Sequence, residues 1–408
     1  MKGEKIMNTE YLSTNVFLRK TLGVCSFIIA LSVFAQAQFP KLPKFEKPKL
    51  PKNEQTTPNT TNTTSAAASN NGTPSNQPFL LKRTIAVQPR RFLRWWKNPS
   101  AAEPVYDTRS WSPEIRFAIN GPIASGSQIT VEFDTADGKP WFTQKMRTPI
   151  LDADRWDDVK DADDINLEQL EKKGTIAQSG LFPFRIRLKN ALNGTDTVLF
   201  SGKYKISTYT PDQKIPENKG KKEFYVDEDW RLPMSWLWLN PQNNEDAPIL
   251  CLQTWFKNSG SSEDIEAFLF YNGKQIVNSK SASPEQVLTN GDDEQPFRYS
   301  LRMFYFSTVR GSNQNKYGAY RDSFFLDKNP GEYEIKIMRK GELARSLKFT
   351  VGADGKMKDN GVTAANKIGG IRSLVPIQII GAADGSWNKT AWQSDAFYTN
   401  PLSGFSAQ

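Results

Sequence analysis

The stretch YEIKIMRKGELARSLKFTV, from Tyr333 to Val351, decides the fold. An earlier stretch, FRIRLKNALNGTDTVLFSGKYKI, runs from Phe184 to Ile206 and has the same design. In both stretches apolar and polar residues alternate along the first arm, a glycine-containing turn follows, and the chain then returns. Alternation with a period of two residues is typical of a half-buried antiparallel strand. Asn-Gly, at positions 193–194, is a strong hairpin signal, so each stretch predicts a β-hairpin.

The two hairpins align, and the similarity continues on their N-terminal side. We align strand 184–189 with strand 333–338, Tyr204 with Phe349, and Ile206 with Val351. Upstream, PEIRFAI from Pro113 aligns with PILCLQTWF from Pro248. A second pair of segments follows, in which QITVEFDTADGKPWFTQK from Gln128 aligns with DIEAFLFYNGKQIVNSK from Asp264. The turns of this second pair lie at Gly138 and Gly273. The order of predicted elements therefore indicates that one domain occurs twice.

A short helix is predicted in each copy. DDINLEQLEKKG, residues 163–174, begins with Asp163 or Asp164 as a cap and ends at a glycine. SPEQVLTNG, residues 283–291, has a serine cap, a proline in the first turn and a glycine at its end.

These patterns predict an all-β protein of two tandem antiparallel β-sandwiches with immunoglobulin-like architecture. The predicted parts are a first sandwich at 79–210, a connector at 211–222, a second sandwich at 223–352, a flexible segment at 353–370 and an aromatic-rich tail at 371–408. Because exposed aromatic side chains are costly, we expect the tail to dock on the second sandwich.

The N-terminus predicts export. Residues 1–37 combine a basic pair, an apolar run at 21–34 and Ala35-Gln36-Ala37, which is typical of a signal peptide cleaved after Ala37. This indicates a secreted or periplasmic protein that does not span a membrane. Residues 38–78 are rich first in Lys and Pro and then in Thr, Asn and Ser, which predicts a disordered linker.

The amino-acid composition excludes several classes of catalytic and metal site. The chain has no histidine, which excludes Ser-His-Asp and Cys-His nucleophilic sites and histidine-ligated metals. Of its two cysteines, Cys25 lies in the predicted signal peptide and Cys251 lies in an apolar run, where we expect a buried structural thiol. We therefore expect a non-catalytic protein without a cofactor.

The formal charge of +9 is carried partly by the signal peptide and the linker. The remainder is only mildly basic, so nucleic acid is not expected as a partner.

Seven Asp residues between positions 152 and 164 suggest a weak calcium site, with Asp152, Asp154, Asp157 and Asp158 as candidate ligands. The spacing does not match an EF-hand, and a solvated acidic loop before a helix is the favoured interpretation.

Tryptophan supplies the other candidate binding residues. They are Trp95, Trp96, Trp236, Trp238, Trp387 and Trp392. Each either packs in a core or offers a ring on which a sugar can stack, and the sequence favours packing for the pair at 236 and 238.

The leading hypothesis is a secreted or periplasmic, non-catalytic binding or assembly protein of the cell envelope, whose partner is an envelope protein or a glycan. The alternative is a carbohydrate-binding module protein. A hydrolase based on two carboxylates ranks third, since Asp and Glu are plentiful but no pair is singled out. The sequence leaves the oligomeric state open.

Overall fold

The computed structural model describes residues 77–94, 105–162, 165–241, 247–258, 265–278, 288–289, 299–312, 320–368, 371–380 and 385–407. Strands dominate its regular structure, which confirms the all-β prediction. The predicted signal peptide, nearly all of the linker, and Trp95 and Trp96 lie outside the described residues. Of the helix predicted at 283–291 only residues 288–289 are described, and there the prediction is wrong, because these residues form a short strand that pairs with Ser300 and Leu301.

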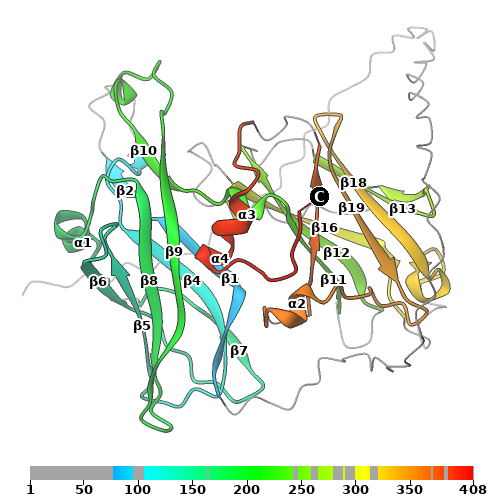
Figure 1. The fold of residues 1–408 in the computed structure, drawn as a ribbon, viewed down its shortest axis with the longest axis horizontal. Coiled ribbons are helices and arrows are strands. Elements are labelled where there is room, and N and C mark those ends of the chain that lie inside the picture. The colour runs from blue at the N-terminus through cyan, green and yellow to red at the C-terminus, as the bar shows by residue number, and fades with distance from the viewer. Residues whose placement is uncertain are drawn as a thin grey trace, which may run out of the picture. The chain divides into compact units, whose positions relative to one another are not determined.

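The N-terminal half, as we call strands β1 to β10, contains two main sheets (Figure 1). The first has the order β1 (Phe79–Pro89), β4 (Pro113–Asn120), β7 (Trp156–Val159). The second has the order β10 (Glu223–Val226), β9 (Asp196–Tyr209), β8 (Gly180–Lys189), β5 (Gln128–Asp134), β6 (Pro140–Lys145). A separate pair is formed by β2 (Phe92–Arg94) and β3 (Val105–Asp107).

The C-terminal half comprises strands β11 to β21. One sheet has the order β15 (Leu288–Thr289), β16 (Tyr299–Arg310), β12 (Ile249–Lys257), β11 (Met234–Asn240), β20 (Ser373–Pro376), with β17 (Phe324–Phe325) beside β16. The other has the order β14 (Lys274–Asn278), β13 (Ile265–Tyr271), β18 (Gly331–Arg339), β19 (Glu342–Val351), β21 (Gln378–Ile379).

The two halves have matching strand orders. The path β9-β8-β5-β6 corresponds to β19-β18-β13-β14, and β1-β4-β7 corresponds to β11-β12-β16. Both hairpins recognised in the sequence occupy the same place in their sheets.

The structure corrects the alignment of the first hairpin arms by two residues. Gly180 and Gly331 begin β8 and β18 with nearly equal φ angles of 147° and 144°. Phe182 then pairs with Tyr204, as Tyr333 pairs with Phe349, and each pair of rings is stacked. Tyr333 thus corresponds to Phe182 and not to Phe184. A slip of two residues keeps every side chain on the same face, so alternation alone cannot detect it.

Helices are few and short. They are α1 (Leu167–Lys173), α2 (Val362–Ala365), α3 (Ala391–Ser394) and α4 (Ala396–Thr399). The predicted helix stop at Gly174 is present, but the cap is Asn166, whose Oδ1 accepts a hydrogen bond of 2.8 Å from the Gln169 N–H. Asparagine at this position is among the best caps because its short amide reaches the unpaired N–H groups. Asp163 and Asp164 lie outside the described residues.

Each half contains an apolar core to which both of its main sheets contribute side chains. In the N-terminal half Phe117 and Val131 belong to one cluster. In the C-terminal half Phe256 and Ile335 belong to another. The first cluster also extends onto β11 and β12 and includes residues of the tail, which we define as 371–407.

Tyr204 provides a test of the N-terminal core. It is fully buried, and among the described residues its hydroxyl has no hydrogen-bond partner. Burial, helped by the negative charge of Asp134, holds the pKa of Tyr204 well above its usual value. The native state therefore keeps this proton when the unfolded chain loses it near pH 10, so the contribution of Tyr204 to stability falls as pH rises above that value.

We expect Tyr204→Phe to raise the free energy of unfolding at pH 7 by about 1 kcal/mol, because the buried hydroxyl is unpaired. It should also flatten the alkaline loss of stability by about 1.4 kcal/mol per pH unit. Denaturant unfolding at pH 7 and pH 11 measures both effects. Tyr209→Phe is the matched control and should destabilise, since the Tyr209 hydroxyl donates to Glu223. A destabilised Tyr204→Phe variant at pH 7 would contradict the assignment.

Candidate functional site

Four charged side chains lie on the segment between β10 and β11. Glu228, Asp229 and Arg231 are 2%, 4% and 6% exposed, and Asp227 lies beside them. Charged residues are rarely buried to this extent unless they are paired. The 3₁₀ turn η2 (Asp229–Arg231) directs these side chains to different elements.

Asp229 connects the C-terminal half to the tail. Its Oδ1 accepts hydrogen bonds of 2.7 Å from the Lys257 ammonium and 2.7 Å from the Tyr299 hydroxyl. Its Oδ2 accepts a bond of 2.7 Å from the backbone N–H of Asn388. Lys257 also donates to the Ser386 carbonyl at 2.9 Å. One carboxylate thereby joins β12, β16 and the tail.

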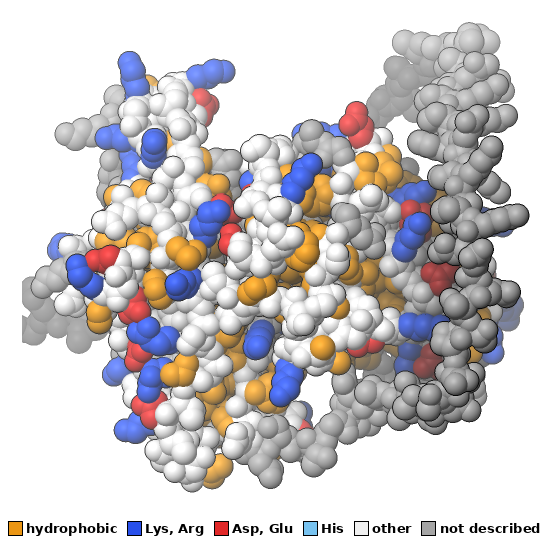
Figure 2. Space-filling view, viewed as in Figure 1, with side chains coloured by type: hydrophobic (Ala, Val, Ile, Leu, Met, Phe, Trp, Pro, Cys, Tyr) orange, Lys and Arg blue, Asp and Glu red, His pale blue; other side chains and the backbone are white. Residues whose placement is uncertain are grey.

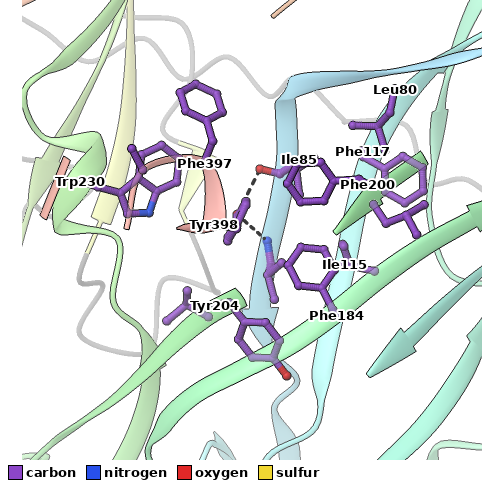
Figure 3. Packing of buried hydrophobic residues seen from close by; sticks show 14 of the residues in the cluster. Leu80, Ile85, Ile115, Phe117, Phe184, Phe200, Tyr204, Trp230, Phe397 and Tyr398 are labelled. Atoms are coloured by element: carbon purple, nitrogen blue, oxygen red, sulfur yellow. Dashed lines mark hydrogen bonds between the residues drawn. The ribbon is translucent and has the colours of Figure 1, made fainter. Parts of the chain in front are cut away.

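Arg231 and Tyr398 connect the N-terminal half to the tail. Arg231 donates to Glu228 Oε1, to the Tyr398 hydroxyl and to the Ile85 carbonyl, each at 2.9 Å. The Tyr398 hydroxyl accepts from the Val87 N–H at 3.0 Å and donates to Glu228 Oε1 at 2.9 Å. Figure 3 shows Tyr398 beside β1, with the bonds to the backbone of residues 85 and 87 drawn. All hydrogen-bonding capacity of this hydroxyl is used.

The electrostatics of this network are those of a structural site. Burial raises the pKa of Tyr398, and the Glu228 carboxylate raises it further. Burial also raises the pKa of Tyr299, together with the charges of Asp227 and Asp229. Burial alone would lower the pKa of Arg231, but Glu228 and Tyr398 more than offset it and the net shift is upward. Both phenols stay protonated and Arg231 stays charged near neutral pH.

The tail reaches this position through a strained turn. Phe397, Tyr398 and Thr399 have φ angles of 47°, 57° and 67°, a left-handed conformation that costs about 1–2 kcal/mol per residue. Gly202 of β9 makes room for it, since a Cβ there would lie 2.9 Å from the Tyr398 carbonyl oxygen. α3 and α4, red in Figure 1, lie against η2 and β9 respectively. The strain persists because the packing and hydrogen bonds of Tyr398 compensate for it.

Four of the six predicted tryptophans lie among the described residues. Trp236 and Trp238 are 2% and 3% exposed. Phe397 packs edge-on against Trp236, and the Arg372 guanidinium lies 4.0 Å above the ring of Trp238. Neither ring offers a face to a ligand in this arrangement.

Trp387 and Trp392 of the tail are half-buried, and Trp392 packs against Phe405. The tail was expected to dock on the second sandwich. It does add β20 and β21 to the sheets of the C-terminal half, but Tyr398 also packs against Phe184 of the N-terminal half.

The four candidate calcium ligands are all exposed. Asp157 and Asp158 are neighbours on β7, where successive side chains point to opposite faces. Within the described ranges no group of three or more carboxylate or cysteine side chains is close enough to hold a metal ion.

A second feature is a groove of about 470 Å³ between β6 and α1. Its lining residues are Trp141, Phe142, Thr143, Gln144, Lys145, Ile165, Asn166, Gln169, Leu170 and Gly174. Trp141 is held edge-to-face against Trp111 at 5.4 Å, and Phe142 packs on Phe133 at 5.0 Å. The groove thus has a fixed aromatic wall.

Gln144 is the unusual member of the lining. It is 5% exposed, and within the described part of the chain its Nε2 has no hydrogen-bond partner. A buried donor without an acceptor costs free energy. Among the described residues of the lining, Lys145 is the one with a charged side chain.

Neither the charge network nor the groove was predicted from the sequence. The run Asp227-Glu228-Asp229-Trp230-Arg231, directly after a strand and before an apolar one, was the available signal for the charge network. The groove has no comparable signal, since it depends on where α1 lies.

Comparison with known proteins assigns no family, because no protein-family model and no curated protein matches the chain. Among the described residues no helix is both long and apolar enough to cross a membrane. Figure 2 shows Lys and Arg side chains interspersed with Asp and Glu over the face drawn, without one large basic patch.

Proposed function

We propose that this protein is a secreted or periplasmic, non-catalytic binding or assembly protein of the cell envelope. The observation that carries the binding role is the groove beside β6, where aromatic rings, a buried unpaired amide and one cation line an open volume. Sites of this size and lining are typical of ligand binding.

The proposed architecture is a tandem pair of β-sandwiches of immunoglobulin-like design that arose by duplication. The matching strand orders support it, as do the equivalent glycines at the start of β8 and β18 and the equivalent stacked rings. The sheets of each half share one apolar core, as a sandwich requires.

The charge network fits a framework better than an active site. Glu228 and Asp229 are bonded to Arg231 and Lys257 and are shielded from solvent. Glycoside hydrolysis by two carboxylates needs both to face a substrate across a cleft. We assign these carboxylates to holding both halves and the tail together.

The groove also supports a second candidate function, carbohydrate binding. Trp141 and Phe142 supply aromatic surface, and Gln144 and Gln169 supply amides that bond to hydroxyl groups. A glycan array probed with the purified protein tests this alternative.

A photo-crosslinking residue placed at Gln169, on the groove, tests the binding role in native cells. We expect a covalent adduct with an envelope component. The same residue at Val198, which is 46% exposed on β9, is the control and should give none. Equal labelling from both positions, or from neither, would contradict a binding role for the groove.

The predicted cleavage of the signal peptide tests whether the protein is exported. Because the small-x-small site ends at Ala37, the mature protein should begin at Gln38. Mass spectrometry of the protein from the exported fraction checks this. Recovery of the chain only in the cytoplasm, with residues 1–37 attached, would overturn the proposed location.

A further inference from the structure

We propose that the loop between β9 and β10, residues 210–222, docks on an anionic lipid surface. The inference goes beyond the groove and takes from the proposed function only that the protein works at the envelope. Tyr209 and Glu223, which flank the loop, pair with each other across β9 and β10. The loop, green and above the label of β10 in Figure 1, projects from one end of the N-terminal half.

The loop is held in shape by its own hydrogen bonds. Gln213 Nε2 donates to the Asn218 carbonyl at 2.8 Å, and Gln213 Oε1 accepts from the Gly220 N–H at 2.9 Å. The Asn218 side chain, which is buried, donates to the Asp212 carbonyl at 3.1 Å and accepts a bond of 2.9 Å from Arg109. A compact loop with paired ends that is packed by its own side chains is an Ω-loop, and such loops are frequently functional.

The loop carries a surplus of positive charge. Its exposed lysines are Lys214, Lys219, Lys221 and Lys222. Within the described part of the chain none of these four ammonium groups forms an ion pair. The acidic residues of the loop are Asp212 and Glu217, and Asp212 Oδ1 already accepts the Lys214 N–H at 2.9 Å. Figure 2 shows basic side chains at this tip, at the upper left. The lysines are therefore available to an anionic partner.

Apolar side chains lie next to these lysines. Ile215 is 36% exposed and directly precedes the 3₁₀ turn η1 (Pro216–Asn218), whose first residue is also exposed. At a membrane interface an apolar side chain enters the acyl boundary while neighbouring ammonium groups stay among the headgroup phosphates.

Other anionic partners use only part of this surface. A soluble acidic polymer would bind the lysines and leave Ile215 in water. A small molecule is usually held in a concave site, whereas this loop projects. We therefore commit to a bilayer that contains anionic lipid.

The linker adds positive charge of its own, because residues 38–57 contain five Lys and two Glu. A basic segment of this kind is also attracted to anionic lipid. The contribution of the loop is therefore measured with loop variants of the chain that begins at Gln38, in which the linker stays unchanged.

The probe is a vesicle of phosphatidylglycerol mixed with phosphatidylcholine, sedimented together with the protein. Binding should weaken as salt is added, because screening shortens the range of the attraction. Replacement of Lys219, Lys221 and Lys222 together by Gln should weaken binding by roughly tenfold or more, since each lysine near an anionic surface is worth about fivefold.

The matched control replaces Lys189, Lys274 and Lys348 together by Gln. These lysines are exposed on other strands and turns, and the net charge changes by the same amount. This control should weaken binding by less than about threefold, because its lysines do not gather at the tip.

A fluorescent label tests whether the apolar tip enters the bilayer. Cys251 is buried, so Ile215→Cys supplies an accessible thiol for a nitrobenzoxadiazole dye. The dye should brighten severalfold on anionic vesicles. Leu192→Cys is the matched control, since Leu192 is 64% exposed in the turn between β8 and β9, at the other end of β9. The dye at that position should stay dim.

The inference is overturned if vesicles of pure phosphatidylcholine bind as well as the anionic ones, or if the two triple variants bind alike. It is also overturned if the dye at position 215 stays dim on anionic vesicles. Binding of soluble polyphosphate through the same lysines, with a dim dye on vesicles, would replace the lipid surface by an acidic polymer. These measurements use purified protein, so their failure leaves the tests of export and of the groove unaffected.

Discussion

Replacement of Asp229 by alanine should lower the free energy of unfolding by about 3–5 kcal/mol, the range found when one partner of a buried ion pair is removed. The variant leaves the Lys257 ammonium buried without its carboxylate. It also deprives the Asn388 N–H of its acceptor and leaves the Tyr299 hydroxyl with only the longer contact of 3.2 Å to Asp227 Oδ1. Chemical denaturation monitored by tryptophan fluorescence gives the difference.

Two comparisons make this result specific. Lys257→Met combined with Asp229→Leu removes both charges, so the double variant should be less destabilised than the sum of the single changes. Asp137→Ala breaks the exposed pair between Asp137 and Lys139 and should leave the unfolding midpoint nearly unchanged. A loss below about 1 kcal/mol for Asp229→Ala would show that the network does not hold the fold together.

Sequence patterns located the strands because each hairpin buries one face. β8 and β18 have the alternating burial that Phe184, Ile186, Ile335 and Ile337 indicate. β12 differs, since both of its faces are covered and even Gln253 and Lys257 are buried. Its second face is closed by the network, whose Asp229 is 28 positions from Lys257, and by the tail, whose Ser386 is 129 positions from Lys257. The spacing of apolar residues within β12 therefore could not predict that both of its faces are buried.

The candidate sites were harder to predict for the same reason. The partners of Asp229 are separated from it by 28, 70 and 159 positions. In the sequence alone, the segment between β10 and β11 therefore looks like an ordinary charged turn. Trp236 and Trp238 are two residues apart on β11 and therefore share a face, but only the tail decides whether that face is open. The groove at β6 depends on the position of α1 and on an amide left unpaired, and neither has a pattern in the sequence.

A chain that ends at residue 370 should lose stability in both halves. It lacks β20 and β21, which extend one sheet edge each in the C-terminal half. It also lacks Tyr398, whose loss from a filled core costs about 3–5 kcal/mol for a large aromatic side chain. Because Tyr398 bonds to β1 and packs on Phe184, the N-terminal half should be affected as well. Differential scanning calorimetry of the full and shortened chains should show all transitions at lower temperature.

Gly202→Val separates the contribution of the turn at Tyr398 from that of the two added strands. The new side chain would start 2.8 Å from Cε1 of Phe200, 2.9 Å from the Tyr398 carbonyl oxygen and 3.1 Å from the Tyr398 Cβ. It therefore disturbs the turn and the Phe200 ring beside it while β20 and β21 stay paired. We expect this variant to destabilise the N-terminal half, and Val198→Ala, an exposed change on the same strand, to have little effect. If the shortened chain melts like the full one, the strained left-handed turn has no compensating contacts and the tail is free to bind elsewhere. If Gly202→Val alone reproduces most of the loss in the N-terminal half, the close packing of Gly202 against Tyr398 and Phe200 accounts for that loss, and the two added strands do not.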